Sequence, residues 1–549
     1  MASHPGPQGR GSWRRGLVPG AVSAAVAAVT AVIAAFAMVA PAVSPASAAA
    51  RPGPGGDWTV YHHDRSGSGR AGPVTTVHTG RRAWTSPQLD GNLYGEPLVW
   101  SGRVYVATEN NTVYALSAAT GKVVWQRHVA PAVPASRLPC GNISPTVGIT
   151  GTPVIDPARR EVFAVADELR NGKPAHVLVG LDAVTGAPRM SVDVDPAGDV
   201  TAALLQRTGL TLSGGRVVFG FGGNFGDCSL YHGRVVSVPE GGGKPSFFTV
   251  DSRPGQREGA VWMGGGAPAV DRAGNVWVTS GNGSVTSARQ PYDHSDAVLE
   301  LTPGMRLVQF FAPRSWARDN AADLDFSAVP ALLPGGQVVA AGKSPIAWLL
   351  DGRHLGGIGG QKASLGNVCT SNVDGGMAVS GRVVYLPCQT GIVAIRATAS
   401  PPALHRVWST GTGGGPPILA AGLVWTISLN GVLYGLDPAH GTIRQRATIG
   451  VPANHFPTPS VGEGLMLAAN ARHVVAFPVT GHRVPPAGTS PATAGSGSPG
   501  GPADGASPPG QSGSAAGPVL ITVAAVVAVL AVGGGLYLSR RRGYLAWRK

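Results

Sequence analysis

Residues that could do chemistry gather in the segments that connect the apolar runs of this chain. Carboxylate and amide oxygens are the ligands that a hard cation such as Ca²⁺ prefers, and a carboxylate beside a hydroxyl can accept its proton. The polar residues that packing does not explain are Glu109, Asn110, Asn111, Asn224, Asp227, Asn282, Asp319, Asp323, Asp325, Lys343, His455 and Asn470. Whether they act together depends on the elements that position them.

A repeated unit defines these elements, and residues 94–129 are its clearest copy. The unit contains a short apolar run and then the stretches RVYVAT, TVYAL and KVVWQ, which are separated by Gly102, by Asn110 and Asn111, and by Thr120 and Gly121. Alternating β-branched and aromatic residues broken by Gly and Asn are typical of strands and tight turns. The unit is therefore predicted to be a four-stranded antiparallel meander.

The same unit recurs almost to residue 480. Its second strand starts near Gly102, Arg160, Gly215, Gly274, Gly336, Gly381, Gly422 and Gly464, which gives eight copies. Copies spaced by ~40 to 60 residues are typical of propeller blades, because one small sheet cannot bury both of its faces. We predict an all-β, eight-bladed propeller over residues 51–481. The eighth copy lacks a fourth strand, and residues 81–85 are predicted to supply it and close the ring.

The meander also predicts on which face each connection emerges. Connections before a first strand and those between the second and third strands leave the same face, and almost all the polar residues named above fall in these two classes. Four Cys in an exported domain should form two disulfides. Cys140 and Cys369 precede first strands, whereas Cys228 and Cys388 follow second strands. We expect the pairs Cys140–Cys228 and Cys369–Cys388 on this face.

The two ends of the chain have other compositions. Residues 1–50 have a basic start, an apolar middle and small residues at the end, which indicates a secretory signal peptide, with an uncleaved anchor as the alternative. Residues 482–517 are a Pro/Gly/Ser-rich linker, residues 518–538 are predicted to span the membrane, and 539–549 form a basic cytoplasmic tail. The propeller is thus expected outside the cell membrane, tethered by one helix.

Composition limits the choice of partners. Charged residues make up only 13% of the chain, with 81 Gly and 47 Pro, as in a turn-rich β protein. The net charge of +14 resides largely in the two ends and in scattered loops, with no basic stripe interleaved with aromatics. We therefore expect no nucleic-acid partner, and a protein, cell-wall or small-molecule ligand on the loop-rich face instead.

The stretches ALSAATGKVVW and DWTVYHHDRSGSG resemble the propeller repeats of the pyrroloquinoline quinone (PQQ) type. Quinoprotein alcohol dehydrogenases and the outer-membrane assembly lipoprotein share these repeats, and the resemblance covers about residues 57–480. By this resemblance Trp262 would lie under the quinone and Lys343 would contact it. Asn282 would bind calcium, and Asp323 or Asp325 would be the base.

This sequence also departs from the pattern of the dehydrogenases. Asn224 stands near the position where the family has a calcium-binding Glu, so the metal would be held by few carboxylates. No two Cys are adjacent, so the family's adjacent-cysteine disulfide is missing. Each residue also has a structural alternative: Trp262 can pack between blades, Asn282 can serve a turn, and Lys343 can pair with one of the aspartates.

Other chemistries have weaker support in the sequence. His62 and His63 with Asp64 could bind a metal, but no G-x-S-x-G elbow precedes a helix, no helix is evident, and no C-x-x-C-H haem motif is present. Two hypotheses remain. The first is a membrane-anchored binding or scaffolding propeller, and the second is a dehydrogenase that uses PQQ and Ca²⁺ to oxidise an alcohol or a sugar.

Overall fold

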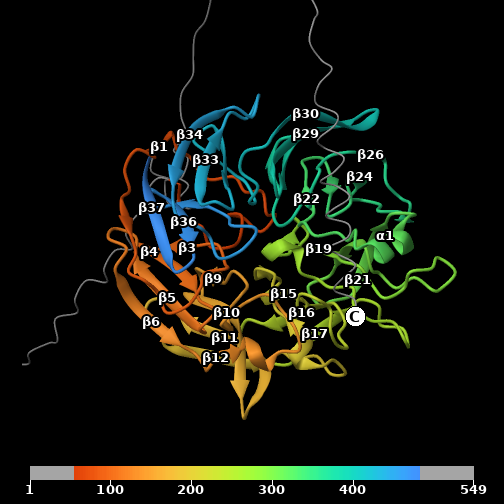
Figure 1. Ribbon diagram of the computed structural model, residues 1–549, viewed down its shortest axis with the longest axis horizontal. Helices are drawn as coiled ribbons and strands as arrows, with labels where there is room; N and C mark the ends of the chain where they lie inside the picture. The colour runs from red at the N-terminus through yellow and green to blue at the C-terminus, as the bar shows by residue number, and fades with distance from the viewer. Residues whose placement is uncertain (1–54, 482–549) are drawn as a thin grey trace, which may run out of the picture. The chain divides into compact units, whose positions relative to one another are not determined.

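The computed structural model describes residues 55–481, which belong to one compact unit. The predictions for the signal peptide, linker, membrane helix and tail lie outside the described residues. Within them, eight sheets with four antiparallel strands each surround a common axis, and the last sheet is completed by strands from the start of the described chain (Figure 1). The predicted eight-bladed β-propeller is confirmed.

The first four blades hold these strands, from the axis outward. Blade 1 has β3 (Leu98–Trp100), β4 (Arg103–Ala107), β5 (Thr112–Ser117) and β6 (Val123–His128). Blade 2 has β9 (Val154–Asp156), β10 (Glu161–Arg170), β11 (Lys173–Asp182) and β12 (Pro188–Asp193). Blade 3 has β14 (Thr211–Ser213), β15 (Arg216–Gly223), β16 (Arg234–Pro239) and β17 (Ser246–Thr249), with β13 (Leu204–Leu205) on β15. Blade 4 has β18 (Ala269–Val270), β19 (Val276–Ser280), β20 (Ala297–Leu301) and β21 (Leu307–Ala312), with β25 (Gly357–Ile358) on β21.

The other four blades continue the ring. Blade 5 has β22 (Ala331–Leu332), β23 (Gln337–Ala340), β24 (Ala347–Asp351) and β26 (Ala363–Leu365). Blade 6 has β27 (Ala378–Ser380), β28 (Val383–Cys388), β29 (Gly391–Ala399) and β30 (Pro402–Thr410). Blade 7 has β31 (Ile418–Ala420), β32 (Leu423–Ile427), β33 (Val432–Leu436) and β34 (Ile443–Thr448). Blade 8 has β35 (Ser460–Gly462), β36 (Leu465–Asn470) and β37 (His473–Thr480), joined by β1 (Thr76–Val77) and β2 (Trp84–Thr85).

The N-terminal strands close the ring as expected. Trp84 and Thr85 in β2 pair with Ala476 and Val475 in β37, and β1 pairs with the end of the same strand. In Figure 1 the first strand, at the red end of the colour range, lies beside β37 at the blue end. The last blade is thus completed by the start of the chain, and its β37 has no unpaired edge.

The position of a strand in its blade determines which residues it carries. The middle strands of blade 1, β4 and β5, are almost wholly buried, because both of their faces pack against neighbouring blades. The outermost strand, β6, alternates between exposed and half-buried residues. The same alternation in β12 and β34 keeps the propeller's outer edge polar.

Tryptophans on outer strands lock neighbouring blades together. The indole of Trp125 in blade 1 donates to the Ala183 carbonyl of blade 2 (3.1 Å), and its ring covers Gly186, which has φ +72°. A Cβ at Gly186 would lie 2.6 Å from that ring, so only glycine fits there. The same contact joins Trp84 to Ala118 and Gly121, and Trp408 to Pro438 and Gly441.

Insertions between the strands carry the remaining elements. These are β7 (Val133–Pro134), β8 (Thr146–Val147), the short 3-10 turns η1 (Ala135–Arg137), η2 (Thr201–Ala203) and η3 (Met263–Gly265), and α1 (Trp316–Ala322). No helix was evident in the sequence of the propeller itself, but the structure has α1 before blade 5. Its seven residues were too few to show a 3.6-residue period in the sequence.

Candidate functional site

The chemically active residues emerge at one end of the propeller. We call this end the loop face. It comprises the connections between blades and those between second and third strands, including residues 108–111, 130–153, 194–210, 224–233, 250–268, 281–296, 313–330, 341–346, 366–377 and 449–459. Both predicted disulfides are confirmed and staple it: Cys140 bonds to Cys228, and Cys369 to Cys388.

Three of the predicted site residues are in direct contact on the loop face. The indole Nε1 of Trp262 donates to Asp325 Oδ2 at 3.1 Å, and Lys343 Nζ lies 2.8 Å from Asp325 Oδ1. The same Nζ is 5.5 Å from the centroid of the Trp262 ring. These residues come from the connections before blades 4 and 5 and from the loop after β23. Closure of the propeller therefore brings Asp325 into contact with Trp262, 63 positions before it in the chain, and with Lys343, 18 positions after it.

Asp323 and Asp325 occupy different environments, although only one residue separates them. Asp325 is 1% exposed, whereas the Asp323 side chain is 69% exposed and reaches Lys343 Nζ at 2.7 Å. Asp323 has φ +56° at the end of α1, and this left-handed residue turns the chain inward toward Asp325. Of the two predicted bases, Asp325 is the one that accepts the hydrogen bond from the Trp262 indole.

Burial and pairing set the charges in this cluster. Burial raises the pKa of Asp325 to about 6, and Lys343 limits the rise. Burial opposes the charge on Lys343, but Asp325 and Asp323 outweigh it, so the pKa of Lys343 is raised. Asp325 is therefore mostly ionised at neutral pH and can accept a proton, while Lys343 stays a cation.

The two predicted amide ligands lie in different places. Asn282 follows Gly281, where a Cβ would lie 2.7 Å from Asp325 Oδ2, so its backbone borders the cluster. Its carbonyl accepts from the Gly259 N–H at 2.9 Å. Asn224 is buried, and its amide donates to the Ala202 carbonyl at 2.9 Å. Asn224 thus holds the loop before blade 3, and no described contact joins it to Asp325.

These residues suit an aromatic ligand better than a divalent cation. Ca²⁺ takes six to eight oxygen ligands, often several of them carboxylates. Both Asp325 oxygens already face the Trp262 N–H and the Lys343 ammonium, and within residues 55–481 no cluster of three or more His, Cys, Asp or Glu side chains could hold a metal. The half-buried Trp262 ring next to a cation instead offers a surface on which a flat, electron-poor ring such as a quinone can stack.

A second cation, absent from the sequence-based prediction, lies on the loop face. The Arg207 guanidinium carbon is 4.6 Å from the centroid of the Phe456 ring and 5.2 Å from that of Tyr94. Phe456 in turn is 6.4 Å from Trp262, between ring centroids. A row of three rings and two cations therefore runs across the loop face, in the order Lys343, Trp262, Phe456, Arg207 and Tyr94. Tyr94 directly precedes the Gly-Glu-Pro start of a first strand, which was the one sequence pattern that could have located part of this row.

The opening segment of the chain crosses the opposite face. Its backbone pairs with first strands around the ring: Trp58 with Val99, Arg65 with Val270, and Gly69 with Leu419. We call residues 57–71 the plug, because they join blades 1, 4 and 7 across the axis. His62, His63 and Asp64, for which a metal-binding role has only weak support in the sequence, are part of the plug.

The reason lies in the environment of these three residues. The His62 ring is fully buried, stacks on Tyr61 with 4.5 Å between centroids, and burial lowers its pKa to about 4. Its backbone N–H donates to Glu96 Oε2 at 2.8 Å, while Asp64 accepts hydrogen bonds from Ser66 and Ser68. The polar motif therefore builds the plug.

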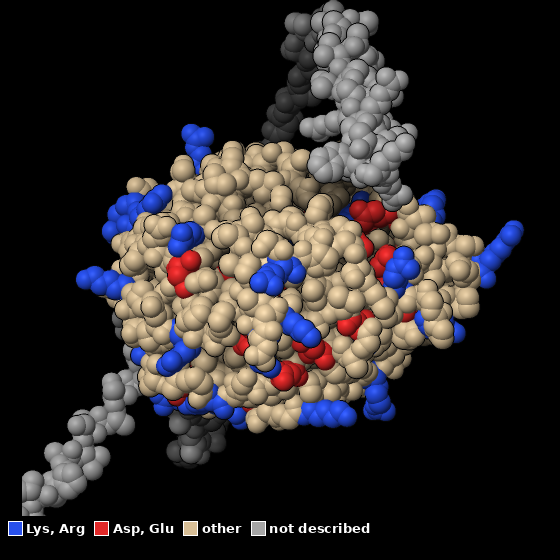
Figure 2. Space-filling view, turned by 60° about the horizontal axis from the view of Figure 1, so that its bottom comes forward, with Lys and Arg blue, Asp and Glu red and all other residues tan. Residues whose placement is uncertain are grey.

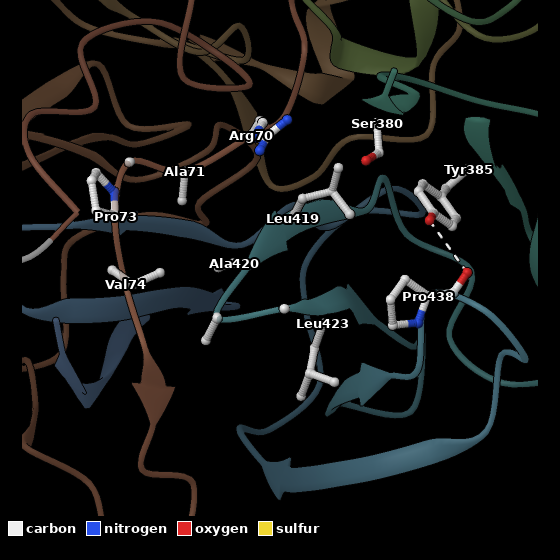
Figure 3. Close-up of a pocket in the computed structure, with 13 residues that line it drawn as sticks. Arg70, Ala71, Pro73, Val74, Ser380, Tyr385, Leu419, Ala420, Leu423 and Pro438 are labelled. Carbon is white, nitrogen blue, oxygen red and sulfur yellow. Dashed lines mark hydrogen bonds between the residues drawn. The ribbon is translucent and has the colours of Figure 1, made fainter. Parts of the chain in front are cut away.

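Two open cavities lie on this opposite face. One, of about 520 Å³, lies between the end of the plug and blades 6 and 7, where the Tyr385 hydroxyl donates to the Pro438 carbonyl at 3.3 Å (Figure 3). The other, of about 940 Å³, lies between the plug and blades 4 and 5. Asp64 lines the second cavity, but neither cavity is lined by Trp262, Asp325 or Lys343.

The surface charges are dispersed. On the face shown in Figure 2, Lys and Arg stand singly, with Asp and Glu among them. Among the residues that the structure describes, no helix is long and apolar enough to cross a membrane.

The fold and the site define a propeller whose blades are locked by tryptophans and whose loop face carries an aromatic, acid and lysine cluster. The family model described as "Outer membrane protein assembly factor BamB" matches residues 7–293. This is just over half of the chain, and the chain belongs to this family of PQQ-type propellers.

Curated relatives are dehydrogenases. The chain is 26% identical over 256 residues to a polyvinylalcohol dehydrogenase of Sphingopyxis sp. (strain 113P3), covering 43% of this chain and 36% of that protein. It is 25% identical over 232 residues to a polyvinylalcohol dehydrogenase of Pseudomonas sp., covering 38% and 33%. The chain thus spans about a third of the length of the curated relatives it matches.

Solved structures share the fold at low identity. Quinohemoprotein alcohol dehydrogenase ADHIIG of Pseudomonas putida HK5 matches with a TM-score of 0.59 at 14% identity, over 80% of this chain and 83% of that one. A europium-containing methanol dehydrogenase matches with a TM-score of 0.55 at 15% identity, over 75% and 89%. These likenesses support the propeller architecture.

Proposed function

We propose that this protein is an oxidoreductase of the quinoprotein type that oxidises an alcohol at the loop face. The observation that carries the proposal is the contact of Trp262, Asp325 and Lys343, since a ring surface, an ionised carboxylate and a cation meet at one point. The polyvinylalcohol dehydrogenases among its relatives support this class of reaction. Buried carboxylates with a raised pKa gather at functional sites, and Asp325 is such a group.

Each residue has a task that follows from its position. A bound quinone would supply the acceptor for hydride from the alcohol carbon. Trp262 offers the stacking surface and orients Asp325 through its N–H. Asp325, ionised above a pKa of about 6, accepts the proton of the substrate hydroxyl. Lys343 keeps this carboxylate ionised despite its burial and places a positive charge beside the ring surface. The donor set does not fit Ca²⁺, so we assign no step to a metal.

The test is a titration of the purified full-length protein with PQQ, with and without CaCl₂, followed by calorimetry and by quenching of tryptophan fluorescence. We expect binding that is lost in Trp262→Ala and weakened in Lys343→Met, and retained in Lys122→Met, which removes an exposed lysine from the opposite face. Asp325→Asn should retain binding but abolish dye-linked oxidation of alcohols. Lack of PQQ binding at high micromolar concentration would refute the proposal.

A second candidate is a binding or scaffolding propeller that has kept the repeat without the chemistry. It is favoured by the poor metal donor set, because the Asn224 amide donates to backbone carbonyls and, within residues 55–481, Asp325 is the only buried carboxylate paired with Lys343. Its ligand would be a protein, a cell-wall polymer or a small molecule. PQQ binding without any alcohol oxidation by the wild-type protein would favour this candidate.

We further propose that the protein is anchored in the cell membrane by residues 518–538, with the propeller outside the cell. The support is the length and apolar character of that segment and the arginines after it. Protease treatment of intact cells should degrade the propeller. Recovery of the full-length protein in the soluble fraction would refute this.

A further inference from the structure

Arg207 is a buried cation whose charge the fold does not use. Arg207 is only 8% exposed, and a charged residue buried to this degree is normally paired. Its guanidinium stacks between the Tyr94 and Phe456 rings, yet no described residue within 55–481 forms a hydrogen bond or an ion pair with that group. The five N–H donors of an arginine are thus held in a fixed plane with no described acceptor.

Glu109 and Asp374 lie near enough to interact with the charge of Arg207, but each of them has one oxygen engaged elsewhere. Glu109 Oε2 accepts from the Gly148 N–H at 2.7 Å and from the Thr150 hydroxyl at 3.1 Å. Asp374 Oδ2 accepts from the Gln389 amide at 3.0 Å. Burial raises the pKa of Glu109 to about 7, which weakens this carboxylate as a counter-ion at neutral pH, and burial also raises the pKa of Asp374.

The arginine is held rigidly by its aromatic neighbours. Tyr94 precedes blade 1 and Phe456 precedes blade 8, and the Asn454 amide ties these segments together by donating to the Tyr94 carbonyl at 2.6 Å. Because the side chain is already restrained in the free protein, it loses less conformational entropy when a ligand binds, which favours a ligand contact.

We propose that Arg207 binds the carboxylate of an anionic alcohol substrate, such as a hydroxy acid or a uronic acid. This rests on the proposed function, because it assigns the substrate class of the same loop-face site. The row of rings separates the two cations: Lys343 lies over Trp262, while Arg207 lies beyond Phe456. Lys343 therefore lies next to a flat ligand that stacks on Trp262, whereas Arg207, beyond Phe456, is available to a second ligand. The planar guanidinium fits a carboxylate through two parallel hydrogen bonds.

The test is a calorimetric titration of the full-length protein, without cofactor, with glucuronate and with glucose as its neutral counterpart. We expect glucuronate to bind more tightly than glucose, and Arg207→Met to weaken glucuronate roughly 10- to 100-fold while leaving glucose unchanged, the loss expected for charge-assisted hydrogen bonds. Arg207→Lys should keep part of the affinity. The control is Arg137→Met, an exposed arginine of the same loop face.

The outcomes separate this inference from the proposed function. Equal binding of glucuronate and glucose, or equal loss of both in Arg207→Met, would overturn it even if PQQ binds. A separate titration of Arg207→Met with PQQ locates the anion: if this variant loses PQQ affinity and keeps glucuronate affinity, the carboxylate belongs to the cofactor and the inference fails. Selective loss of glucuronate in a protein that never binds PQQ would support Arg207 and refute the dehydrogenase.

Discussion

Replacement of Lys343 by Met should make the stability of the propeller depend strongly on pH. Asp325 is 1% exposed, and Lys343 is its only described cationic partner. In the wild type the pKa of Asp325, about 6, lies roughly two units above the value in the unfolded chain. The folded state therefore holds the proton of the Asp325 carboxyl more tightly than the unfolded state does. The contribution of Asp325 to the stability of the wild type therefore falls as pH rises from about 4 to 6, by about 3 kcal/mol for two pH units, and does not recover at higher pH.

Without Lys343 the charge on Asp325 has no compensation. Breaking a buried ion pair costs about 3–5 kcal/mol, and the lower end applies here because the Lys343 side chain is 19% exposed. We expect Lys343→Met to lose about 3 kcal/mol at pH 8. At pH 5, where Asp325 is mostly protonated in the wild type, only the exposed contact with Asp323 is lost, which contributes less than about 1 kcal/mol.

The assay is unfolding in guanidinium chloride at pH 5 and at pH 8, followed by tryptophan fluorescence. Lys122→Met serves as the control for loss of an exposed lysine. Adding Asp325→Asn to Lys343→Met should restore most of the stability at pH 8, because the amide carries no charge. A loss of equal size at both pH values, or no rescue by the second substitution, would show that the ion pair does not control Asp325.

Three further predictions concern the frame that carries the site. Gly186→Ala should destabilise the propeller by about 2–3 kcal/mol, because the new Cβ meets the Trp125 ring at 2.6 Å and φ is positive. The control is Gly172→Ala, which has a similar φ but open space around the new Cβ and should cost about 1 kcal/mol in the same unfolding assay. Trp125→Phe should lose about 1 kcal/mol with its hydrogen bond, and a melting temperature equal to that of the wild type would contradict this. Replacing Cys140 and Cys228 by Ser should cost about 4–5 kcal/mol, since that bridge closes a segment of 88 residues, and unchanged denaturation under reducing conditions would refute it.

The sequence alone was sufficient for the architecture. Alternating apolar residues and turn glycines report local backbone structure, so the repeat could be counted and its eight second strands placed. The same alternation predicted that the segment containing Trp84 completes the last blade, and it placed four cysteines on one face in the pairs that the structure shows. The family resemblance added Trp262, Asp325 and Lys343, and the structure brings these three together.

Contacts across the axis depended on the tertiary structure. Nothing local distinguishes Asp325 from Asp323, since their burial is decided by the turn that ends α1. Arg207 and Phe456 are 249 positions apart in the chain and meet only because the ring closes. The plug was invisible for the same reason, because His62 is polar in sequence and becomes buried only when distant blades surround it. Local periodicity determines the blades, whereas the contacts near the axis join residues of distant blades and are defined only by their assembly.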